Sequence, residues 1–356
     1  MEKRVLTTLG ACALTLAAGP VLANGFDRIN VPPTYLFEEG TYVELRYAAV
    51  QPNVSGSFAG GALATGDIGS NYSRIGGAYK QDINDRVSFA IDFGQPHGID
   101  IEYPTLAPPP LATLSGLTTE VQSDALTLLG RYKLNDRFSV FGGPRFQRFR
   151  GTVDSDAAGA FELDSSDYEI GFLLGVAFER PETATRLAIT YTSDFEHVLE
   201  TTSVATGIAS PVDTVIRTPE SLQIAFETGI AANTLLFATY RHSKWSDANL
   251  EYLGSTLTDF VDVNRYSLGV GRQVTEKLGL RLAFSYQTGA DSPVGSLSPF
   301  EDRRSIALAA RYQATENVRL GLGVAYTWLD DATTTAAGDF TGNDATSFGL
   351  SVGYNF

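Results

Sequence analysis

The chain ends in Phe348-Gly349-Leu350-Ser351-Val352-Gly353-Tyr354-Asn355-Phe356, which alternates strictly between large apolar and small or polar side chains. A period of two is typical of a β-strand, because successive side chains point to opposite faces of the sheet. One face of this last strand is therefore apolar, and the other is small and polar. The same alternation recurs from Val318 to Trp328 and from Leu278 to Gln287. These patterns predict an all-β protein.

Fourteen stretches of the chain share this alternation. They begin near Thr41, Arg74, Val87, Ala125, Phe138, Tyr168, Arg186, Ser221, Thr234, Val263, Leu278, Ser305, Val318 and Thr346. Each is long enough to cross a bilayer when tilted, which takes about 9 to 11 residues.

The connections alternate between short polar turns and long segments rich in Gly, Ser, Thr and Asp. The short turns are Asp82 to Arg86, Asn135 to Arg137, Pro181 to Thr185, Ala231 to Asn233, Thr275 to Lys277 and Ala314 to Asn317. Outer-membrane barrels have this asymmetry, with short periplasmic turns and long extracellular loops. The apolar faces cannot form the core of a soluble protein. Fourteen strands around such a core would leave a wide interior lined by the opposite face, which is small and polar. If the apolar face meets lipid instead, closing the barrel pairs every backbone group. We therefore expect a 14-stranded antiparallel transmembrane β-barrel over residues 41–356, with both of its ends in the periplasm.

Composition excludes several other classes of protein. Hydrophobic residues make up 43% of the 356 residues and charged residues 19%, which excludes a disordered tail or a coiled coil. No run of about 18 apolar residues follows the first two dozen positions, so a helical membrane protein is also excluded. The net charge of −15 repels phosphate backbones and argues against nucleic acid as a partner.

Residues 1–23 have the pattern of a signal peptide. A short charged start precedes a mostly apolar stretch from Val5 to Ala18, and Val21-Leu22-Ala23 offers small residues for cleavage. Cleavage after Ala23 would remove Cys12 and leave no cysteine for disulfides or thiol chemistry. The alternative is a lipoprotein site at Leu9-Gly10-Ala11-Cys12, although the apolar stretch continues beyond Cys12.

The C-terminal Tyr354 and Phe356 resemble the signal that the barrel-assembly machinery of Gram-negative outer membranes recognises. Internal motifs resemble the FadL/TodX family of outer-membrane transporters for long-chain fatty acids and other hydrophobic compounds. These motifs are Glu39-Gly40-Thr41, Asn84-Asp85-Arg86, Phe93-Gly94, Ile101-Glu102-Tyr103, Tyr132-Lys133-Leu134-Asn135, Leu187 to Ser193, Thr218-Pro219-Glu220-Ser221 and Trp245-Ser246. The resemblance extends from Phe37 to Phe356 and implies a location in the outer membrane of a Gram-negative bacterium.

The resemblance is weakest before the first strand. Family members place a longer hatch inside the barrel, whereas only residues 24–40 lie between the expected cleavage site and the first strand. Any plug must therefore be small. The sequence Asn30 to Thr34 resembles a remnant of the family's hatch motif, and its two prolines would keep it extended. This departure leaves a leakier channel as an alternative.

Arginine dominates the face that we expect to line the lumen. That face carries Glu44, Arg46, Asp92, Arg131, Arg145, Arg186, Glu227, Arg241, Arg265, Arg281, Arg311 and Arg319. An arginine fork binds a carboxylate through two hydrogen bonds, so Arg46, Arg131, Arg145 and Arg241 are candidates to bind the head of an anionic amphiphile. The alternative is a ladder of arginine–carboxylate pairs that fills the lumen. Small residues on this face, such as Ala90 and Ala188, leave room for an acyl tail.

The third strand is interrupted by Gly94-Gln95-Pro96-His97-Gly98. Pro96 lacks a ladder donor, and Gly94 and Gly98 permit a bend. The family resemblance implies a kink here that opens the barrel wall sideways; alternatively, Gly94 simply ends the strand. Apolar residues of the long segments 152–167 and 196–220 are candidates for external capture of cargo. They include Phe161, Val204, Ile208 and Val215.

The sequence has no motif that indicates catalysis. The three histidines stand apart without metal-ligand spacing, and no nucleophile elbow or phosphate loop is present in the sequence. We expect no enzyme activity, cofactor or metal. The sequence favours a monomeric passive transporter of fatty acids or other hydrophobic or amphiphilic compounds, with outer-membrane lipids and lipopolysaccharide as neighbours. A general porin for small hydrophilic solutes and a structural or adhesive barrel are the alternatives.

Overall fold

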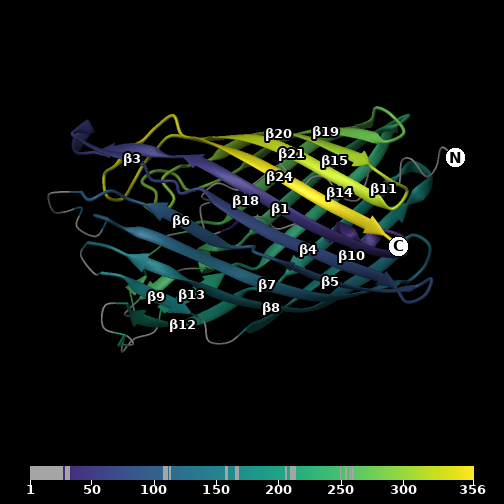
Figure 1. The fold of residues 1–356 in the computed structure, drawn as a ribbon, viewed down its shortest axis with the longest axis horizontal. Coiled ribbons are helices and arrows are strands. Elements are labelled where there is room, and N and C mark those ends of the chain that lie inside the picture. The colour runs from purple at the N-terminus through teal and green to yellow at the C-terminus, as the bar shows by residue number, and fades with distance from the viewer. Residues whose placement is uncertain are drawn as a thin grey trace.

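Fourteen antiparallel strands close into a barrel in the computed structural model (Figure 1). The described residues are 27–28, 33–106, 111, 114–156, 159–164, 168–204, 207–208, 214–248, 250–252, 255–256, 258 and 260–356. The barrel strands are β1 (Thr41–Asn53), β4 (Tyr72–Asp82), β5 (Val87–Gly94), β7 (Thr118–Lys133), β8 (Phe138–Asp154), β10 (Glu169–Arg180), β11 (Thr185–Thr192), β14 (Ser221–Ala231), β15 (Thr234–Ser243), β18 (Val263–Gln273), β19 (Leu278–Gln287), β20 (Arg303–Gln313), β21 (Val318–Leu329) and β24 (Asp344–Asn355). The predicted fold class is confirmed, while the expected signal peptide lies outside the described residues.

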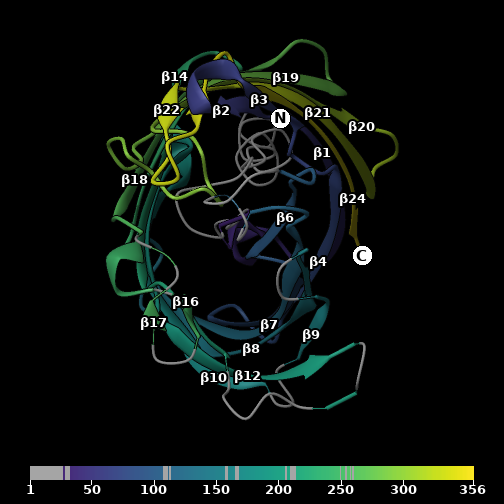
Figure 2. The same ribbon diagram turned by 90° about the vertical axis from the view of Figure 1, so that its left-hand side faces the viewer.

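The first and last strands close the barrel by pairing with each other. β1 pairs with β24 from Tyr42↔Asn355 to Asn53↔Asp344, and its other edge pairs with β4. The start of β1 and the end of β24 therefore lie at one end of the barrel, on the right in Figure 1. Figure 2 looks along the barrel from the opposite end, where the strands form a ring. No free edge remains between the first and last strands, as hydrocarbon requires.

The apolar faces of the strands look outward. Leu308 and Leu350 are 53% and 50% exposed, whereas their sequence neighbours Ala307 and Ser351 are 7% and 8% exposed. This is the inverse of a soluble core and confirms that the small and polar faces line the lumen.

Hydrogen-bonding side chains shape several of the short turns. Asn84 Oδ1 accepts from the N–H groups of Arg86 and Val87 at 2.9 and 3.0 Å. Asn135 does the same in the turn between β7 and β8. Such bonds satisfy backbone donors locally and fix a tight reversal. The short turns share the end of the barrel that holds Phe356, which we call the turn end; the opposite end is the loop end.

The long connections carry further secondary structure. They contain the strands β2 (Ser55–Phe58), β3 (Leu63–Asp67), β6 (Gly98–Glu102), β9 (Phe161–Asp164), β12 (Phe195–Ser203), β13 (Thr214–Thr218), β16 (Leu250–Tyr252), β17 (Ser255–Thr256), β22 (Ala332–Thr333) and β23 (Asp339–Phe340). Short 3-10 helices are η1 (Thr34–Phe37), η2 (Ala59–Gly61), η4 (Pro181–Thr183) and η5 (Trp245–Asp247). Within the described residues, no helix has the length and hydropathy needed to span a membrane.

The long segments 152–167 and 196–220 contain strands that extend beyond the barrel wall. β8 continues to Asp154 and pairs with β9, and β9 in turn pairs with β12. β12 and β13 form a hairpin from Phe195↔Thr218 to Leu199↔Thr214. These segments lie in solvent at the loop end, so they carry polar residues such as Thr and Glu among their apolar residues. Their strand pattern is therefore harder to recognise than that of the barrel strands.

The outward orientation predicts how a charge on the barrel wall affects stability. Leu308 lies at the middle of β20, so Leu308→Arg should cost about 2–4 kcal/mol in the free energy of unfolding from lipid vesicles. Ile83 is 65% exposed in the turn between β4 and β5, so Ile83→Arg should cost at most about 1 kcal/mol. Urea unfolding in vesicles measures both values, and equal costs would contradict this orientation.

Candidate functional site

The ladder between β4 and β5 covers only the second half of β4. β5 pairs with β4 from Asp82↔Ser88 to Gly77↔Phe93, and no strand in the described residues continues this pairing along Tyr72 to Gly76. β5 ends at Gly94 and β6 begins at Gly98, and both pair with β7. The backbone ladder of the wall is therefore interrupted between Tyr72 to Gly76 of β4 and the segment that joins β5 to β6.

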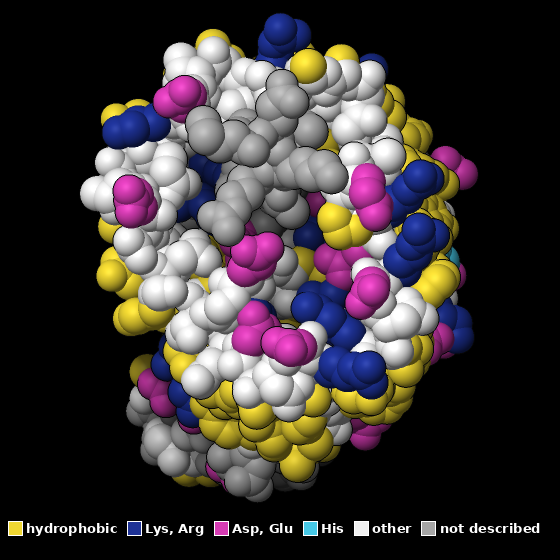
Figure 3. Space-filling view, turned by 90° about the vertical axis from the view of Figure 1, so that its right-hand side faces the viewer, with side chains coloured by type: hydrophobic (Ala, Val, Ile, Leu, Met, Phe, Trp, Pro, Cys, Tyr) yellow, Lys and Arg dark blue, Asp and Glu magenta, His cyan; other side chains and the backbone are white. Residues whose placement is uncertain are grey.

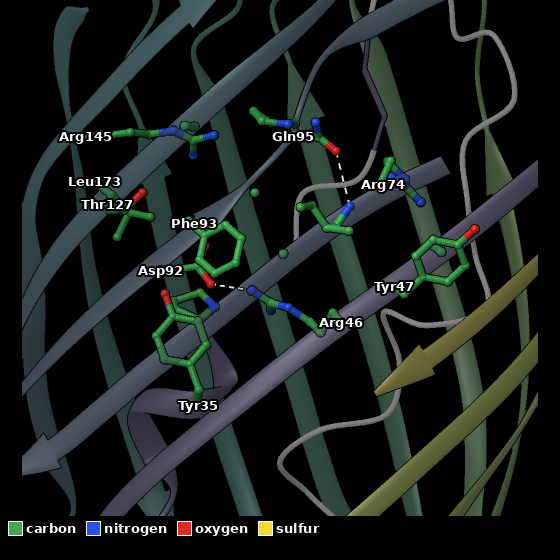
Figure 4. Close-up of a pocket in the computed structure, with 17 residues that line it drawn as sticks. Tyr35, Arg46, Tyr47, Arg74, Asp92, Phe93, Gln95, Thr127, Arg145 and Leu173 are labelled. Carbon is green, nitrogen blue, oxygen red and sulfur yellow. Dashed lines mark hydrogen bonds and ion pairs between the residues drawn. The ribbon is translucent and has the colours of Figure 1, made fainter. Parts of the chain in front are cut away.

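The residues of the interruption are held on the β7 side. The N–H of His97 donates to Ser123 Oγ at 3.0 Å, and the N–H of Ser123 donates to the His97 carbonyl at 2.9 Å. Pro96 has no N–H to offer toward β4. Gln95 partly replaces the missing strand partner, because its Oε1 accepts from the N–H of Ile75 at 3.2 Å (Figure 4).

A pocket of about 100 Å³ lies at this interruption of the ladder. Its lining includes Tyr47, Ile75 and Phe93, which are 44%, 58% and 40% exposed on the lipid side of the wall. Its lining also includes lumen-facing side chains from β1, β4, β5 and β8 (Figure 4). These are Arg46, Arg74, Asp92 and Arg145. The lining of the pocket thus includes both lumen-facing and lipid-facing side chains.

One arginine of this pocket forms an ion pair, whereas two others have guanidinium nitrogens without a hydrogen-bond partner within the described residues. Arg46 forms an ion pair with Asp92, and its Nε lies 3.7 Å from Glu44 Oε1. Arg74 and Arg145 are only 7% and 8% exposed. Within the described residues, Nε and Nη2 of Arg74 and Nε of Arg145 have no hydrogen-bond partner. The pocket therefore holds buried donors that remain available to a ligand.

The first described residues lie against the inner side of the interruption. Asp27 forms a β-bridge with His97, and the N–H of Arg28 donates to the Pro96 carbonyl at 2.7 Å. Asp27 Oδ2 accepts from Arg241 Nη1 and from Trp245 Nε1, each at 3.2 Å. The N-terminal segment is thereby fixed to the lumen wall beside the pocket.

A second part of the N-terminal segment fills the turn end of the lumen. Tyr35 and Leu36 of η1 are buried. The Phe37 ring lies between two guanidinium groups, 4.4 Å from Arg131 and 4.5 Å from Arg186. We call residues 33–40 the plug. Figure 3 shows basic and acidic side chains gathered around this end of the barrel.

Ion pairs and hydrogen bonds hold the plug to the wall. Glu38 binds Arg319 through two hydrogen bonds of 2.8 and 3.2 Å, and both side chains are more than nine-tenths buried. Arg131 Nη1 donates to the Leu36 carbonyl at 3.1 Å, and Arg131 also forms an ion pair with Glu179. Lys80 Nζ donates to the carbonyls of Glu38 and Gly40.

Apolar side chains from the connections pack together at the loop end. This cluster includes Phe58, Ile68, Tyr103, Phe149, Leu199, Trp245, Phe260, Phe300 and Phe340. The apolar cluster therefore lies at the loop end and the plug at the turn end, with the arginine-rich pocket between them.

The predicted head-group residues fall into two sets. Arg46 and Arg145 line the pocket, whereas Arg131 and Arg241 contact the N-terminal segment. The expected alternative of arginine–carboxylate pairs is also represented, since Arg186 lies 2.6 Å from Glu227.

The predicted kink residues lie around the interruption. Gly94 and Pro96 line the pocket. Gly98 contacts Arg28 so closely that a Cβ would lie 2.6 Å from its Nε. Sequence reasoning missed Arg74 and Gln95. The alternation along Tyr72–Asp82 places Arg74 on the same face as Gly76 and Ala78, so this signal was present in the sequence.

The predicted capture residues all lie in the connections at the loop end. Val204 and Ile208 are 54% and 68% exposed. Phe161 of β9 and Val215 of β13 are half-buried.

The closed barrel, short turns, internal plug and outward apolar surface define an outer-membrane transport channel. The family model of the outer membrane protein transport proteins (OMPP1/FadL/TodX) matches residues 34–356. The chain belongs to this family, whose members are transport channels for hydrophobic compounds in Gram-negative outer membranes. The predicted family and location are thus confirmed.

Solved structures agree with this fold. A Pseudomonas aeruginosa FadL homologue has a TM-score of 0.71 at 16% identity, covering 96% of this chain and 100% of the homologue. The P. putida toluene transporter TodX has a TM-score of 0.67 at 14% identity, covering 98% and 99%. The CymD monoaromatic hydrocarbon channel has a TM-score of 0.62 at 15% identity, covering 97% and 99%. None of the curated protein sequences compared with the chain matches it.

The plug predicts a measurable barrier to ions. Glu38→Gln removes one carboxylate of a buried ion pair, a change that typically costs about 3–5 kcal/mol. We expect the plug to loosen and the single-channel conductance in planar bilayers to rise severalfold. Glu182→Gln is the matched control, since Glu182 is 59% exposed in the turn before β11. Equal conductance for the wild type and Glu38→Gln would show that the plug does not limit ion flow.

Proposed function

We propose that this protein is a passive transporter of long-chain fatty acids or similar hydrophobic or amphiphilic compounds. Cargo leaves the lumen sideways through the pocket beside the interruption of the third barrel strand. The observation that carries this proposal is the lining of that pocket, which joins buried arginines in the lumen to Ile75 and Phe93 on the lipid side. A hydrophobic tail then reaches the outer leaflet without crossing the aqueous periplasm.

The filled lumen supports this function over a general porin. The Glu38–Arg319 pair and the ring of Phe37 lie inside the turn end, and the apolar cluster packs at the loop end. A water-filled path for hydrophilic solutes would need both ends open. The similarity to a toluene transporter and to a monoaromatic hydrocarbon channel agrees with an apolar cargo.

Capture begins at the loop end. Val204 and Ile208 present apolar surface there, and Phe161 and Val215 extend it toward the barrel. Such a surface offers about 25 cal/mol for each Å² of apolar area that cargo covers. The protein works as a monomer among outer-membrane lipids and lipopolysaccharide.

The last strand serves as the signal for the barrel-assembly machinery. Tyr354 and Phe356 are 39% and 75% exposed, and their ring centroids lie 4.6 Å apart at the turn end. An aromatic pair at the end of the closing strand is accessible before β24 pairs with β1.

Uptake by cells tests the transport function. Cells that contain the protein should take up labelled hexadecanoate faster than cells that lack it, because the outer leaflet otherwise resists hydrophobic compounds. A labelled disaccharide of similar mass serves as the hydrophilic comparison. Faster uptake of the disaccharide alone would favour a porin, and equal uptake of hexadecanoate with and without the protein would contradict the proposal.

A larger side chain in the pocket tests the lateral exit. A Cβ at Gly94 meets no atom within 4 Å, so Gly94→Leu fills the opening without a backbone clash. We expect uptake of hexadecanoate to fall severalfold while the barrel assembles normally.

The matched control for this variant is Gly295→Leu. Gly295 also has no atom within 4 Å of an added Cβ, and it lies in a loop away from the pocket. Normal uptake by Gly94→Leu, measured at equal amounts of folded protein, would rule out exit at this position.

A further inference from the structure

The outer surface of the barrel has a hollow over β7, β8 and β10. Its volume is about 790 Å³, and its lining residues differ from those of the pocket beside the interrupted strand. The lining includes Gly130 and Gly142, which lie directly opposite each other in the β7–β8 ladder. Neither residue has a side chain to cover the backbone, so the outward surface is depressed at this point.

Apolar side chains that point outward surround these two glycines. Tyr132 of β7, Val140 of β8 and Leu174 and Val176 of β10 line the hollow, and each is at least 38% exposed. All four belong to the surface that faces hydrocarbon in the closed barrel. A hollow left empty would forfeit dispersion contacts along this lining, so hydrocarbon of the bilayer fills it.

Basic residues border the hollow at the turn end. Arg86 directly precedes Val87 of the lining, and Lys133 directly follows Tyr132. The N–H of Lys133 donates to the Arg86 carbonyl at 2.8 Å, so the two turns are adjacent. Arg137 is exposed in the turn between β7 and β8. The apolar hollow is therefore bordered by three basic residues on its periplasmic side.

These three basic side chains are available to an anion. Within the described residues, the side chains of Arg86, Lys133 and Arg137 have no ion pair or hydrogen-bond partner. Asp85 and Asp136 are exposed in the same two turns, so the basic groups outnumber the acidic ones. A positively charged border beside an apolar hollow matches the two parts of a phospholipid, which are its phosphate and its acyl chains.

We propose that this hollow binds one phospholipid of the periplasmic leaflet. One acyl chain lies over Gly130 and Gly142, and the phosphate lies among Arg86, Lys133 and Arg137. The turn end is the periplasmic end of the barrel, so head and chain point in the direction of a lipid in that leaflet. This lipid lies on the outer surface of the wall, whereas the proposed cargo passes through the lumen.

Native mass spectrometry tests this site. The protein in detergent is titrated with phosphatidylglycerol, and the lipids that remain bound are counted after the micelle is removed. Gly130→Leu fills the hollow, since an added Cβ meets only the Gly142 carbonyl oxygen, at 3.9 Å. The wild type should retain one lipid. Gly130→Leu should bind this first lipid about tenfold more weakly, because methylene groups of the acyl chain lose their buried position.

The matched control is Val352→Leu. Val352 is 50% exposed on β24, so this change also enlarges the outward apolar surface, but away from the hollow. Equal binding by the wild type and both variants would overturn the proposal, because the lipid then only coats the surface. Displacement of the lipid by an equal concentration of hexadecanoate would also overturn it, because the hollow would then hold free fatty acid.

Two further experiments locate the head and the chain. The double variant Lys133→Gln, Arg137→Gln should bind the lipid severalfold more weakly, and an unchanged affinity would contradict the position of the phosphate. Phosphatidylglycerol with a diazirine in one acyl chain, irradiated with the wild type in vesicles, should label Tyr132, Val140 or Leu174. Labelling spread evenly around the barrel would overturn the proposal. This labelling needs no variant, so it decides the question even if Gly130→Leu fails to assemble.

Discussion

The structure depends on pairing backbone groups that hydrocarbon cannot satisfy. Each unpaired N–H or C=O in a bilayer costs several kcal/mol, so the barrel must close through β1 and β24. The interruption between β5 and β6 is compatible with this constraint because side chains take over from the missing ladder. Gln95 accepts from the N–H of Ile75, and Ser123 binds both backbone groups of His97. The ladder is thus interrupted without leaving these donors unpaired.

The charge of the molecule is divided between its interior and its surface. The chain has a net charge of −15, yet the described lumen is rich in arginine. A buried guanidinium is costly unless a carboxylate or carbonyl accepts its hydrogen bonds. The wall supplies some of these acceptors, as in Arg186–Glu227, and the N-terminal segment supplies Asp27, Glu38 and the Leu36 carbonyl. The N-terminal segment therefore both fills the lumen and neutralises part of its charge.

The sequence predicts the barrel well because its signal is local. A period of two specifies which face of each strand meets lipid, and the short turns specify which strands are neighbours. The sequence could not predict the partners of Arg131 and Arg241, because Leu36 and Asp27 lie 95 and 214 residues away in the chain. Only the path of the N-terminal segment through the lumen brings these groups together. Arg74, in contrast, was missed although its strand alternation indicated the lumen.

A plug of few residues contacts several parts of the barrel because long side chains of the wall point inward toward it. Arg131 of β7 and Arg186 of β11 both reach the ring of Phe37, so a single aromatic ring contacts two parts of the wall. Cation–π contacts of this kind strengthen when they are desolvated. Arg319 reaches from β21 to Glu38 in the same way. Long side chains of the wall thus span part of the width of the lumen. The plug therefore needs only a few residues to contact a wall of fourteen strands.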